Sequence, residues 1–206
     1  MTDKQVIPEF VKGEFPVSHN RFLRWVGRLG LRVLGGWKIN GEMPHVRKAI
    51  LPVAPHTSNW DFPVGACVML AMGLKLNYLA KSSLFRFPLK GLLTKLGGLP
   101  IDRSSANGVV GNMVRAFREK NELILVITPE GTRKRVKEWK KGFLHMAQQA
   151  RVPVVPIAFD YARKAIDIGP ALMIGDELEK ELARVRPVAR GGDHHGLPAR
   201  RGRGVG

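Results

Sequence analysis

The chain alternates between short apolar runs and segments in which apolar residues recur every three or four positions. Short apolar runs bounded by turn residues predict strands, and the helical period predicts helices. The expected strands are 37–41, 48–54, 76–81, 98–101, 122–127, 152–159 and 165–168. The expected helices are 19–34, 58–73, 85–96, 107–120, 141–150 and 176–185. Because strands and helices alternate, the sequence predicts a single α/β domain with a mostly parallel central sheet flanked by helices.

The first expected helix, 19–34, has two chemically different faces. At 100° per residue its arginines share one side; they are Arg21, Arg24, Arg28 and Arg32. The other side is apolar and carries Phe22, Trp25, Val26, Leu29 and Val33. Such an amphipathic helix either lies at a membrane surface, or packs its apolar side on the domain core and leaves the basic side in water.

Charge and cysteine content narrow the choice of partners and compartment. The chain has 34 Lys and Arg against 17 Asp and Glu, a net charge of +17. Such a surface attracts polyanions, among them nucleic acid, anionic lipid headgroups and phosphorylated substrates. No apolar run reaches the roughly 18 residues that span a bilayer, and the first residues lack a hydrophobic signal core, so we expect no export. The only cysteine, Cys67, lies in an apolar run, which predicts a buried, unreactive thiol.

The last residues, 186–206, differ from the rest because they are rich in Gly and Arg and have no apolar period. They cannot pack a core, so we expect a disordered basic tail, for which a nucleic-acid or membrane role stays open. His194 and His195 lack partners at metal-ligand spacing, so no metal site is expected. The expected organisation is an N-terminal segment at 1–40, one domain at 41–185 and the tail.

Polar side chains gather where three of the expected strands end. The three segments are PHTSNWD at 55–61, PIDR at 100–103 and PEGTR at 129–133. Ligands of open α/β sheets bind beyond the carboxyl ends of the strands. Side chains from distant parts of the chain are therefore expected at one site.

His56 and Asp61 bring proton chemistry to the first of these segments. A histidine moves protons near neutral pH, and a carboxylate bound to one ring nitrogen fixes the tautomer and leaves the other nitrogen as a base. At this spacing the two meet only if His56 lies in the loop and Asp61 in the first turn of the next helix. The alternative is that Ser58 to Asp61 forms a capping box, in which Asp61 merely closes the helix.

Arg103 and Arg133 bring positive charge to the other two segments. A guanidinium group matches phosphate oxygens, and Gly131 lets the backbone turn sharply or approach a ligand. Alternatively, each arginine pairs with its neighbouring acid, Asp102 or Glu130, in a structural salt bridge. Because all three segments follow strands of one small domain, we favour a shared site for a phosphate and a proton.

In combination these segments resemble the glycerophospholipid acyltransferase family, to which the 1-acylglycerol-3-phosphate O-acyltransferases belong. The family's four sequence blocks occur in order within roughly residues 20–170 of the chain. They are His-x4-Asp at 56–61, Gly-Leu-Pro-Ile-Asp-Arg at 98–103, Pro-Glu-Gly-Thr-Arg at 129–133 and Val-Pro-Ile-Ala at 155–158. The second block departs from the usual Phe-Ile-Asp-Arg, and Pro55 replaces the asparagine that commonly precedes the histidine. The second block also helps bind the acceptor, so the acceptor's identity stays open.

The resemblance implies an O-acyltransferase that uses no cofactor and no metal. It would move a fatty acyl group from acyl-ACP or acyl-CoA to the free hydroxyl of a lysophospholipid, first of all 1-acylglycerol-3-phosphate. His56 would be the general base and Asp61 would orient it. No enzyme nucleophile is required, in agreement with the lack of a G-x-S-x-G motif.

The resemblance also implies which residues hold the acceptor. Arg103, Glu130 and Arg133 match family positions that hold its phosphate, and Lys81 matches a lysine often found near it. Glu130 is expected to hold an arginine in place rather than touch the phosphate. The backbone amides of Gly131 or Thr132 are candidate oxyanion donors, without a decisive argument for either.

A lipid substrate gives the 19–34 helix a role at the membrane. Its Phe and Trp side chains would enter the headgroup boundary while its arginines meet anionic lipid. Trp25 and Trp37, near the two ends of the helix, suit an interfacial depth. We therefore expect a peripheral protein on the cytoplasmic face of the cell membrane, held through residues 19–37.

Other functions remain open at this point. The acceptor could be another lysolipid, such as a lyso-ornithine lipid, or the fold could serve a catalytically silent lipid-binding module. The charge of +17 and the Arg/Gly-rich end fit a nucleic-acid-binding protein. However, the sequence has no recognised nucleic-acid motif and no aromatic-rich strand face for stacking bases, so no nucleic-acid partner is expected.

Overall fold

The structure is a computed structural model that describes residues 7–55, 60–95, 97–101, 106–130 and 138–189. The helices are α1 (Arg21–Val33), α2 (Asp61–Met72), α3 (Leu89–Lys95), α4 (Ala106–Glu119), α5 (Gly142–Ala150) and α6 (Leu178–Ala189), with short 3-10 helices η1 (Glu9–Val11) and η2 (Ser82–Leu84). The strands are β1 (Lys38–Asn40), β2 (Lys48–Ala54), β3 (Asn77–Lys81), β4 (Gly98–Ile101), β5 (Leu123–Ile127), β6 (Ile157–Asp160) and β7 (Ala165–Ile168). Every expected element is present, and the predicted α/β class is confirmed.

One sheet with the strand order β1-β7-β6-β2-β5-β3-β4 forms the centre of the molecule. All its strand pairs are parallel except β6 with β7. The register aligns Leu51 of β2 and Tyr78 of β3 with the same residue, Val126 of β5. Parallel pairing therefore brings the ends of β2, β3, β4, β5 and β6 to one side of the sheet, which we call the carboxyl edge.

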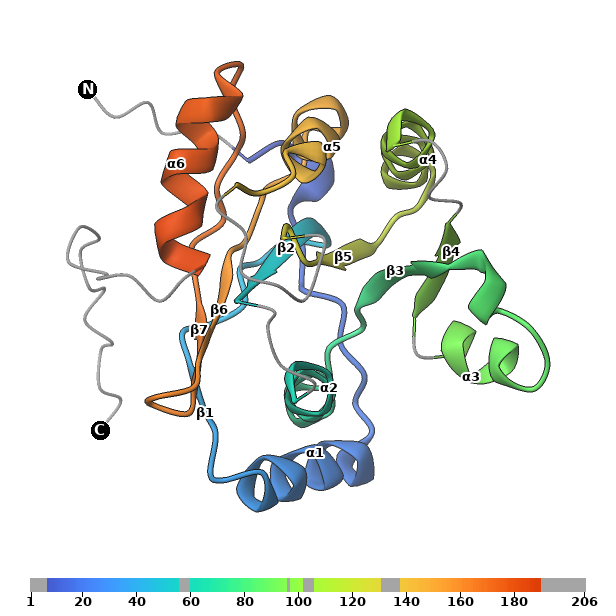
Figure 1. Cartoon of the computed structure of the whole chain (residues 1–206), viewed down its shortest axis with the longest axis vertical. Coiled ribbons are helices and arrows are strands. Elements are labelled where there is room, and N and C mark those ends of the chain that lie inside the picture. Colours follow the sequence, from blue (N-terminus) through green and yellow to red (C-terminus); the bar gives the residue numbers. More distant parts are fainter. Residues whose placement is uncertain (1–6, 56–59, 96, 102–105, 131–137, 190–206) are drawn as a thin grey trace.

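Helices cover both faces of the sheet (Figure 1). Helix α2 connects β2 to β3, and α3 connects β3 to β4, so the chain advances toward the β4 end of the sheet. Helices α4 and α5 connect β4 to β5 and β5 to β6, so the chain then returns toward the β1 end. Right-handed crossovers then place α2 and α3 on one face and α4 and α5 on the other. Helix α6 lies on the face of α4 and α5, and α1 packs on α2.

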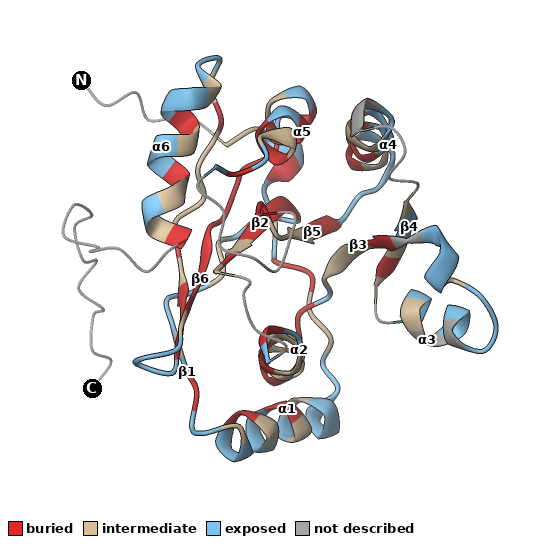
Figure 2. Ribbon diagram, viewed as in Figure 1, coloured by how far each residue is buried: buried red, intermediate tan, exposed pale blue. Residues whose placement is uncertain are grey.

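The core lies between the sheet and these helices. Strand β2 is buried at every position except Val53, as expected for a parallel strand covered on both faces. The largest fully buried side chains include Ile50, Ile124, Phe117 and Phe143. Buried residues follow the strands and the inner sides of the helices in Figure 2.

Helix α1 approaches α2 closely at a glycine, and its buried residues are Gly27 and Leu31. Gly27 is buried, and a Cβ added there would lie 2.3 Å from the backbone nitrogen of Ala71. This close approach leaves Phe22, Trp25, Leu29 and Val33 exposed, with Val33 77% accessible. The alternative in which α1 packs this apolar side on the domain core is therefore wrong. Cys67 lies partly buried at the same helix pair, and burial raises the pKa of its thiol.

The expected strand 152–159 begins later than predicted and is not an edge strand. Pro153 and Pro156 come before β6, and the strand lies between β7 and β2. The proline carbonyls accept hydrogen bonds from the amides of Ile50 and Gly169, at 3.0 and 2.8 Å. Because proline has no N–H to donate, only an isolated bridge to β2, between Val154 and Ile50, comes before the second proline, and the continuous strand starts after it.

The C-terminal helix is longer than predicted. Helix α6 continues through Ala189, past residue 186, where the tail was expected to begin. Val185 and Ala189 are fully buried, so the helix gains packing up to its last residue. Residues 190–206 lie outside the described part of the chain. Among the helices that the structure describes, none is both long and apolar enough to cross a bilayer.

Candidate active site

All three polar segments follow strands whose ends meet at the carboxyl edge. His56 comes two residues after β2, Arg103 two residues after β4, and Glu130 three residues after β5. The last residue of β3 is Lys81, whose backbone pairs with Ile101 at the end of β4. The topology therefore gathers these parts of the chain at one edge, as the sequence predicted.

The described residues cover only part of the predicted constellation. His56, Arg103, Gly131, Thr132 and Arg133 lie outside them. Of Lys81 the structure describes the backbone alone, at the end of β3. Asp61 and Glu130 are described in full, and both are buried, each with a side chain 4% accessible.

Asp61 is the first residue of α2. A capping box would place its carboxylate at the third helical position, whereas the cap position here is Trp60, which makes no side-chain capping bond. The capping-box alternative also depends on Ser58, which lies outside the described residues. The positive end of the helix dipole favours a carboxylate in this first turn, and Asp61 is placed where a loop residue after β2 can reach it.

Tyr161 is a site residue that the sequence did not reveal. Its hydroxyl donates a hydrogen bond to Oδ1 of Asp61. The parallel pairing of Ala54 with Ala158 makes β6 run past the end of β2, so Tyr161, which follows β6, lies beside the start of α2. Its ring meets the buried ring of Trp37 edge-on, with centroids 5.1 Å apart. The only sequence signal was an aromatic residue just beyond an expected strand.

A hydrogen-bonded network fixes the turn that carries Tyr161. The Asp160 carboxylate accepts bonds from the Arg163 backbone N–H at 2.8 Å and from Nε of the same residue at 2.5 Å. These bonds, the backbone one first, lower the pKa of Asp160. Arg163 also donates to Asp167 at 2.5 Å, and Asn40 of β1 donates to the other oxygen of Asp167 at 2.7 Å. The Tyr161 turn is thereby tied to three strands.

Glu130 is buried where the chain leaves β5. The carbonyl of its neighbour, Pro129, accepts a hydrogen bond from the backbone N–H of Lys140 at 2.9 Å. Trp139 is buried beside Lys140 and packs edge-on against Phe143 of α5, with centroids 6.5 Å apart. A backbone hydrogen bond thus holds Pro129 and Lys140 together, and a buried Glu130 fits a role in holding another side chain.

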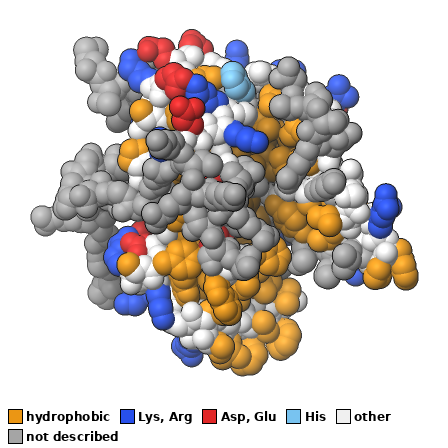
Figure 3. All heavy atoms as spheres, in the orientation of Figure 1, with side chains coloured by type: hydrophobic (Ala, Val, Ile, Leu, Met, Phe, Trp, Pro, Cys, Tyr) orange, Lys and Arg blue, Asp and Glu red, His pale blue; other side chains and the backbone are white. Residues whose placement is uncertain are grey.

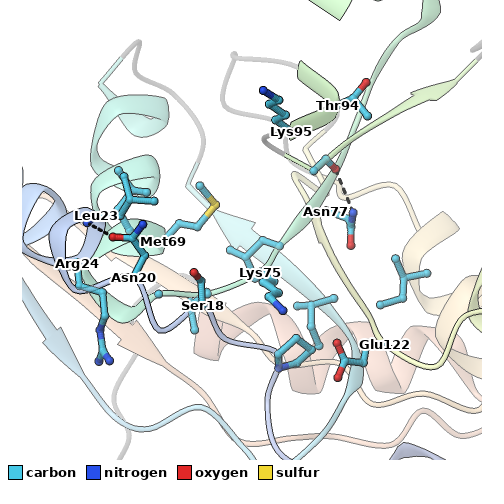
Figure 4. Close-up of a pocket in the computed structure, with 18 residues that line it drawn as sticks. Ser18, Asn20, Leu23, Arg24, Met69, Lys75, Asn77, Thr94, Lys95 and Glu122 are labelled. Atoms are coloured by element: carbon cyan, nitrogen blue, oxygen red, sulfur yellow. Dashed lines mark hydrogen bonds between the residues drawn. The ribbon is translucent and has the colours of Figure 1, made fainter. Parts of the chain in front are cut away.

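A cavity of about 540 Å³ lies away from this site. The cavity lies near the residues at which β3 and β5 begin. Its lining includes Asn77, Glu122, Arg24 and Lys75 (Figure 4). The Asn77 amide donates to the Gly97 carbonyl at 3.2 Å inside it. Because strands begin at the opposite edge from where they end, this cavity is not part of the candidate active site.

The fold and the buried carboxylate at the carboxyl edge define an α/β enzyme domain, and comparison with known proteins gives its family. Residues 38–160 match the family model called Acyltransferase. The chain belongs to this family, the glycerophospholipid acyltransferases. The match includes both buried acids, Asp61 and Glu130, and also the position of His56.

Individual relatives agree with this assignment. A 1-acyl-sn-glycerol-3-phosphate acyltransferase of Limnanthes douglasii is 34% identical over 182 residues, 79% of this chain and 58% of the relative. A lyso-ornithine lipid O-acyltransferase of Pseudomonas aeruginosa is 31% identical over 175 residues, 82% of this chain and 65% of the relative. The chain thus spans less than two thirds of the length of either relative.

A solved structure has the same fold. The crystal structure of the 1-acyl-sn-glycerophosphate (LPA) acyltransferase from Thermotoga maritima superposes with a TM-score of 0.55. The match covers 82% of this chain and 77% of that one at 20% sequence identity. At this identity the likeness supports the fold, while substrate and mechanism have to be argued from this chain's own residues.

Proposed function

We propose that the protein transfers a fatty acyl group from acyl-ACP or acyl-CoA to the free hydroxyl of 1-acylglycerol-3-phosphate, which gives phosphatidate. The observation that carries this proposal is the buried Asp61 at the first turn of α2, beside the carboxyl edge and bonded by Tyr161. A carboxylate held in this way is suited to orient a histidine from the loop after β2.

The reaction proceeds by direct transfer. His56 takes the proton from the acceptor hydroxyl, and the resulting oxygen nucleophile attacks the thioester carbonyl. The new C–O bond forms first and gives a tetrahedral intermediate; its C–S bond then breaks, and the proton held by His56 passes to the departing thiolate. Asp61 fixes the His56 tautomer and stabilises the imidazolium between these two steps. Tyr161 is a positioning residue, because it acts on Asp61 and not on the substrate.

Cationic side chains after β3, β4 and β5 bind the acceptor's phosphate. Arg103 and Arg133 offer planar pairs of donors, and Lys81 adds a point charge. The buried Glu130 holds one of the arginines in place. Backbone amides at Gly131 or Thr132 stabilise the oxyanion of the tetrahedral intermediate.

The apolar face of α1 holds the protein on the cytoplasmic side of the cell membrane as a peripheral protein. Five large apolar side chains of this helix are exposed, and Phe22 stacks on Trp25 with ring centroids 6.1 Å apart. In the space-filling view, apolar side chains gather over the region of α1 and α2 (Figure 3). Exposure of such a face, together with arginines on the same helix, supports contact with anionic lipid.

A lyso-ornithine lipid is the second candidate acceptor, because a relative with that activity in its name matches 82% of the chain. A panel of purified lysolipids offered to the protein with acyl-ACP and acyl-CoA, with products identified by mass spectrometry, separates the two. We expect phosphatidate from lysophosphatidate. Acylation of another lysolipid with lysophosphatidate left unchanged would contradict the proposed acceptor, and no acylation of any lysolipid would contradict the proposed function.

Replacing Tyr161 with phenylalanine should lower kcat about tenfold and leave the KM for both substrates unchanged. The variant removes only the hydrogen bond that holds Asp61. Tyr78→Phe is the matched control, because the buried Tyr78 hydroxyl has no hydrogen-bond partner among the described residues. Steady-state kinetics of the two variants decide the point: equal kcat values would show that the Tyr161 hydroxyl has no positioning role.

A further inference from the structure

We propose that residues 82–95, which we call the α3 projection, form a second contact with an anionic lipid bilayer. The projection consists of η2, the turn 85–88 and α3. This inference rests on the proposed function, since it assumes a membrane-lipid substrate. It concerns a surface separate from α1 and assigns it a part in orienting the protein.

The tip of the projection exposes large apolar side chains. Phe87 is 96% accessible to solvent and Leu84 is 50% accessible. Phe87 and Pro88 also border an open hollow of about 590 Å³ together with Gly91 and Thr94. A phenylalanine that is almost fully exposed gains nothing from the fold, so it marks a surface that another apolar phase covers.

Positive charge surrounds this apolar tip. Between residues 77 and 101 the sequence has Lys81, Arg86, Lys90 and Lys95 and no Asp or Glu. Arg86, Lys90 and Lys95 are exposed, and none of the three forms an ion pair with any residue that the structure describes. An apolar tip with unpaired cations around it is complementary to anionic headgroups above acyl chains.

The position of the α3 projection suits contact with the same bilayer that α1 contacts. Helices α1, α2 and α3 all lie on one side of the sheet, with α4, α5 and α6 on the other (Figure 1). We therefore assign the exposed apolar residues of α1 and of the projection to the same bilayer. The projection starts directly after Lys81 at the carboxyl edge, so its contact brings that surface to the rim of the candidate active site. Two contacts fix an orientation, whereas α1 alone leaves the protein free to turn.

Binding to vesicles tests the α3 projection through Phe87→Ser. Full-length wild-type and variant proteins are sedimented with vesicles of phosphatidylcholine containing phosphatidylglycerol, and with vesicles of phosphatidylcholine alone. We expect about tenfold weaker binding of the variant to the anionic vesicles. Phe10→Ser is the matched control: Phe10 is 50% accessible but lies in η1, and the residue after η1 pairs with Val46, just ahead of β2 and away from the carboxyl edge. It should bind like the wild type.

A second measurement separates failure of this inference from failure of the proposed function. Phe87→Trp should show added tryptophan quenching by brominated lipids in anionic vesicles, and Phe87→Ser should keep its turnover on monomeric short-chain lysophosphatidate. Equal vesicle binding by Phe87→Ser and wild type would overturn the α3 projection as a membrane contact. A Phe87→Ser variant that changes only self-association would also overturn it, because the surface would then bind a second copy of the chain. A variant that changes only the KM for acyl-ACP would overturn it too, because the surface would then bind the carrier protein. A wild type without acyl transfer would overturn the proposed function instead.

Discussion

Replacing His56 with alanine should lower acyl transfer by about 10²- to 10⁴-fold, the range that a positioned general base contributes. Without the imidazole, water has to accept the proton of the acceptor hydroxyl, while substrate binding by the cationic side chains is kept. The loss should therefore fall on kcat, and the KM for the lysolipid should change little. Initial rates with saturating acyl donor measure both quantities.

His145→Ala is the control for this variant. His145 is exposed on α5, which covers the sheet face opposite to α2, and its replacement should leave turnover unchanged. Both proteins should unfold in urea at the wild-type midpoint. Full turnover by a folded His56→Ala protein would rule out the His-Asp mechanism and leave the family's fold with another catalytic arrangement.

Replacing Asp61 with asparagine should lower kcat by about 10²-fold, because the amide no longer stabilises the imidazolium and can favour the wrong His56 tautomer. The same change removes a negative charge from the first turn of α2, a contribution to folding of about 0.3–1 kcal/mol. Activity and the free energy of unfolding have to be measured together, because a purely structural Asp61 would lose activity only in proportion to lost folding.

Glu179→Gln offers a matched control for the structural part of the Asp61 effect. Glu179 is also an acid in the first turn of a helix, α6, and forms an ion pair with Lys141, the cap residue of α5. Its replacement should cost a similar free energy of unfolding and leave kcat unchanged. If both variants lost activity to the same extent, Asp61 would have no catalytic role of its own.

The sequence predicted the fold well because the fold depends on local patterns. The buried strand β2 and the strands β4 and β7 begin and end at the predicted residues, since apolar runs of this kind have few alternative structures. The sequence also predicted that the strands before the polar segments end at one edge of the sheet. Polar segments that directly follow parallel strands have to meet at one edge of the sheet, however far apart they are in the chain.

Contacts between distant residues could not be predicted in the same way. Tyr161 and Asp61 are 100 positions apart, and they meet only because β6 pairs with β2 and extends past it. The outward direction of the apolar face of α1 depends on Gly27, whose close contact with α2 has no signal in the hydrophobic pattern. The exposure of Phe87 likewise depends on the turn before α3, because an apolar residue beside a predicted helix is equally compatible with a core position.

The central claim, that His56 and Asp61 act as a pair, is tested most directly by long-range ¹H–¹⁵N NMR of protein labelled at histidine. The chain has 6 histidines, and the His56 signals are assigned by their absence in His56→Ala. Above the titration range of the rings, we predict a single His56 tautomer with its proton on Nδ1, and loss of that tautomer in Asp61→Asn while the remaining histidine signals stay in place. An identical His56 spectrum in the wild type and Asp61→Asn would contradict the pairing.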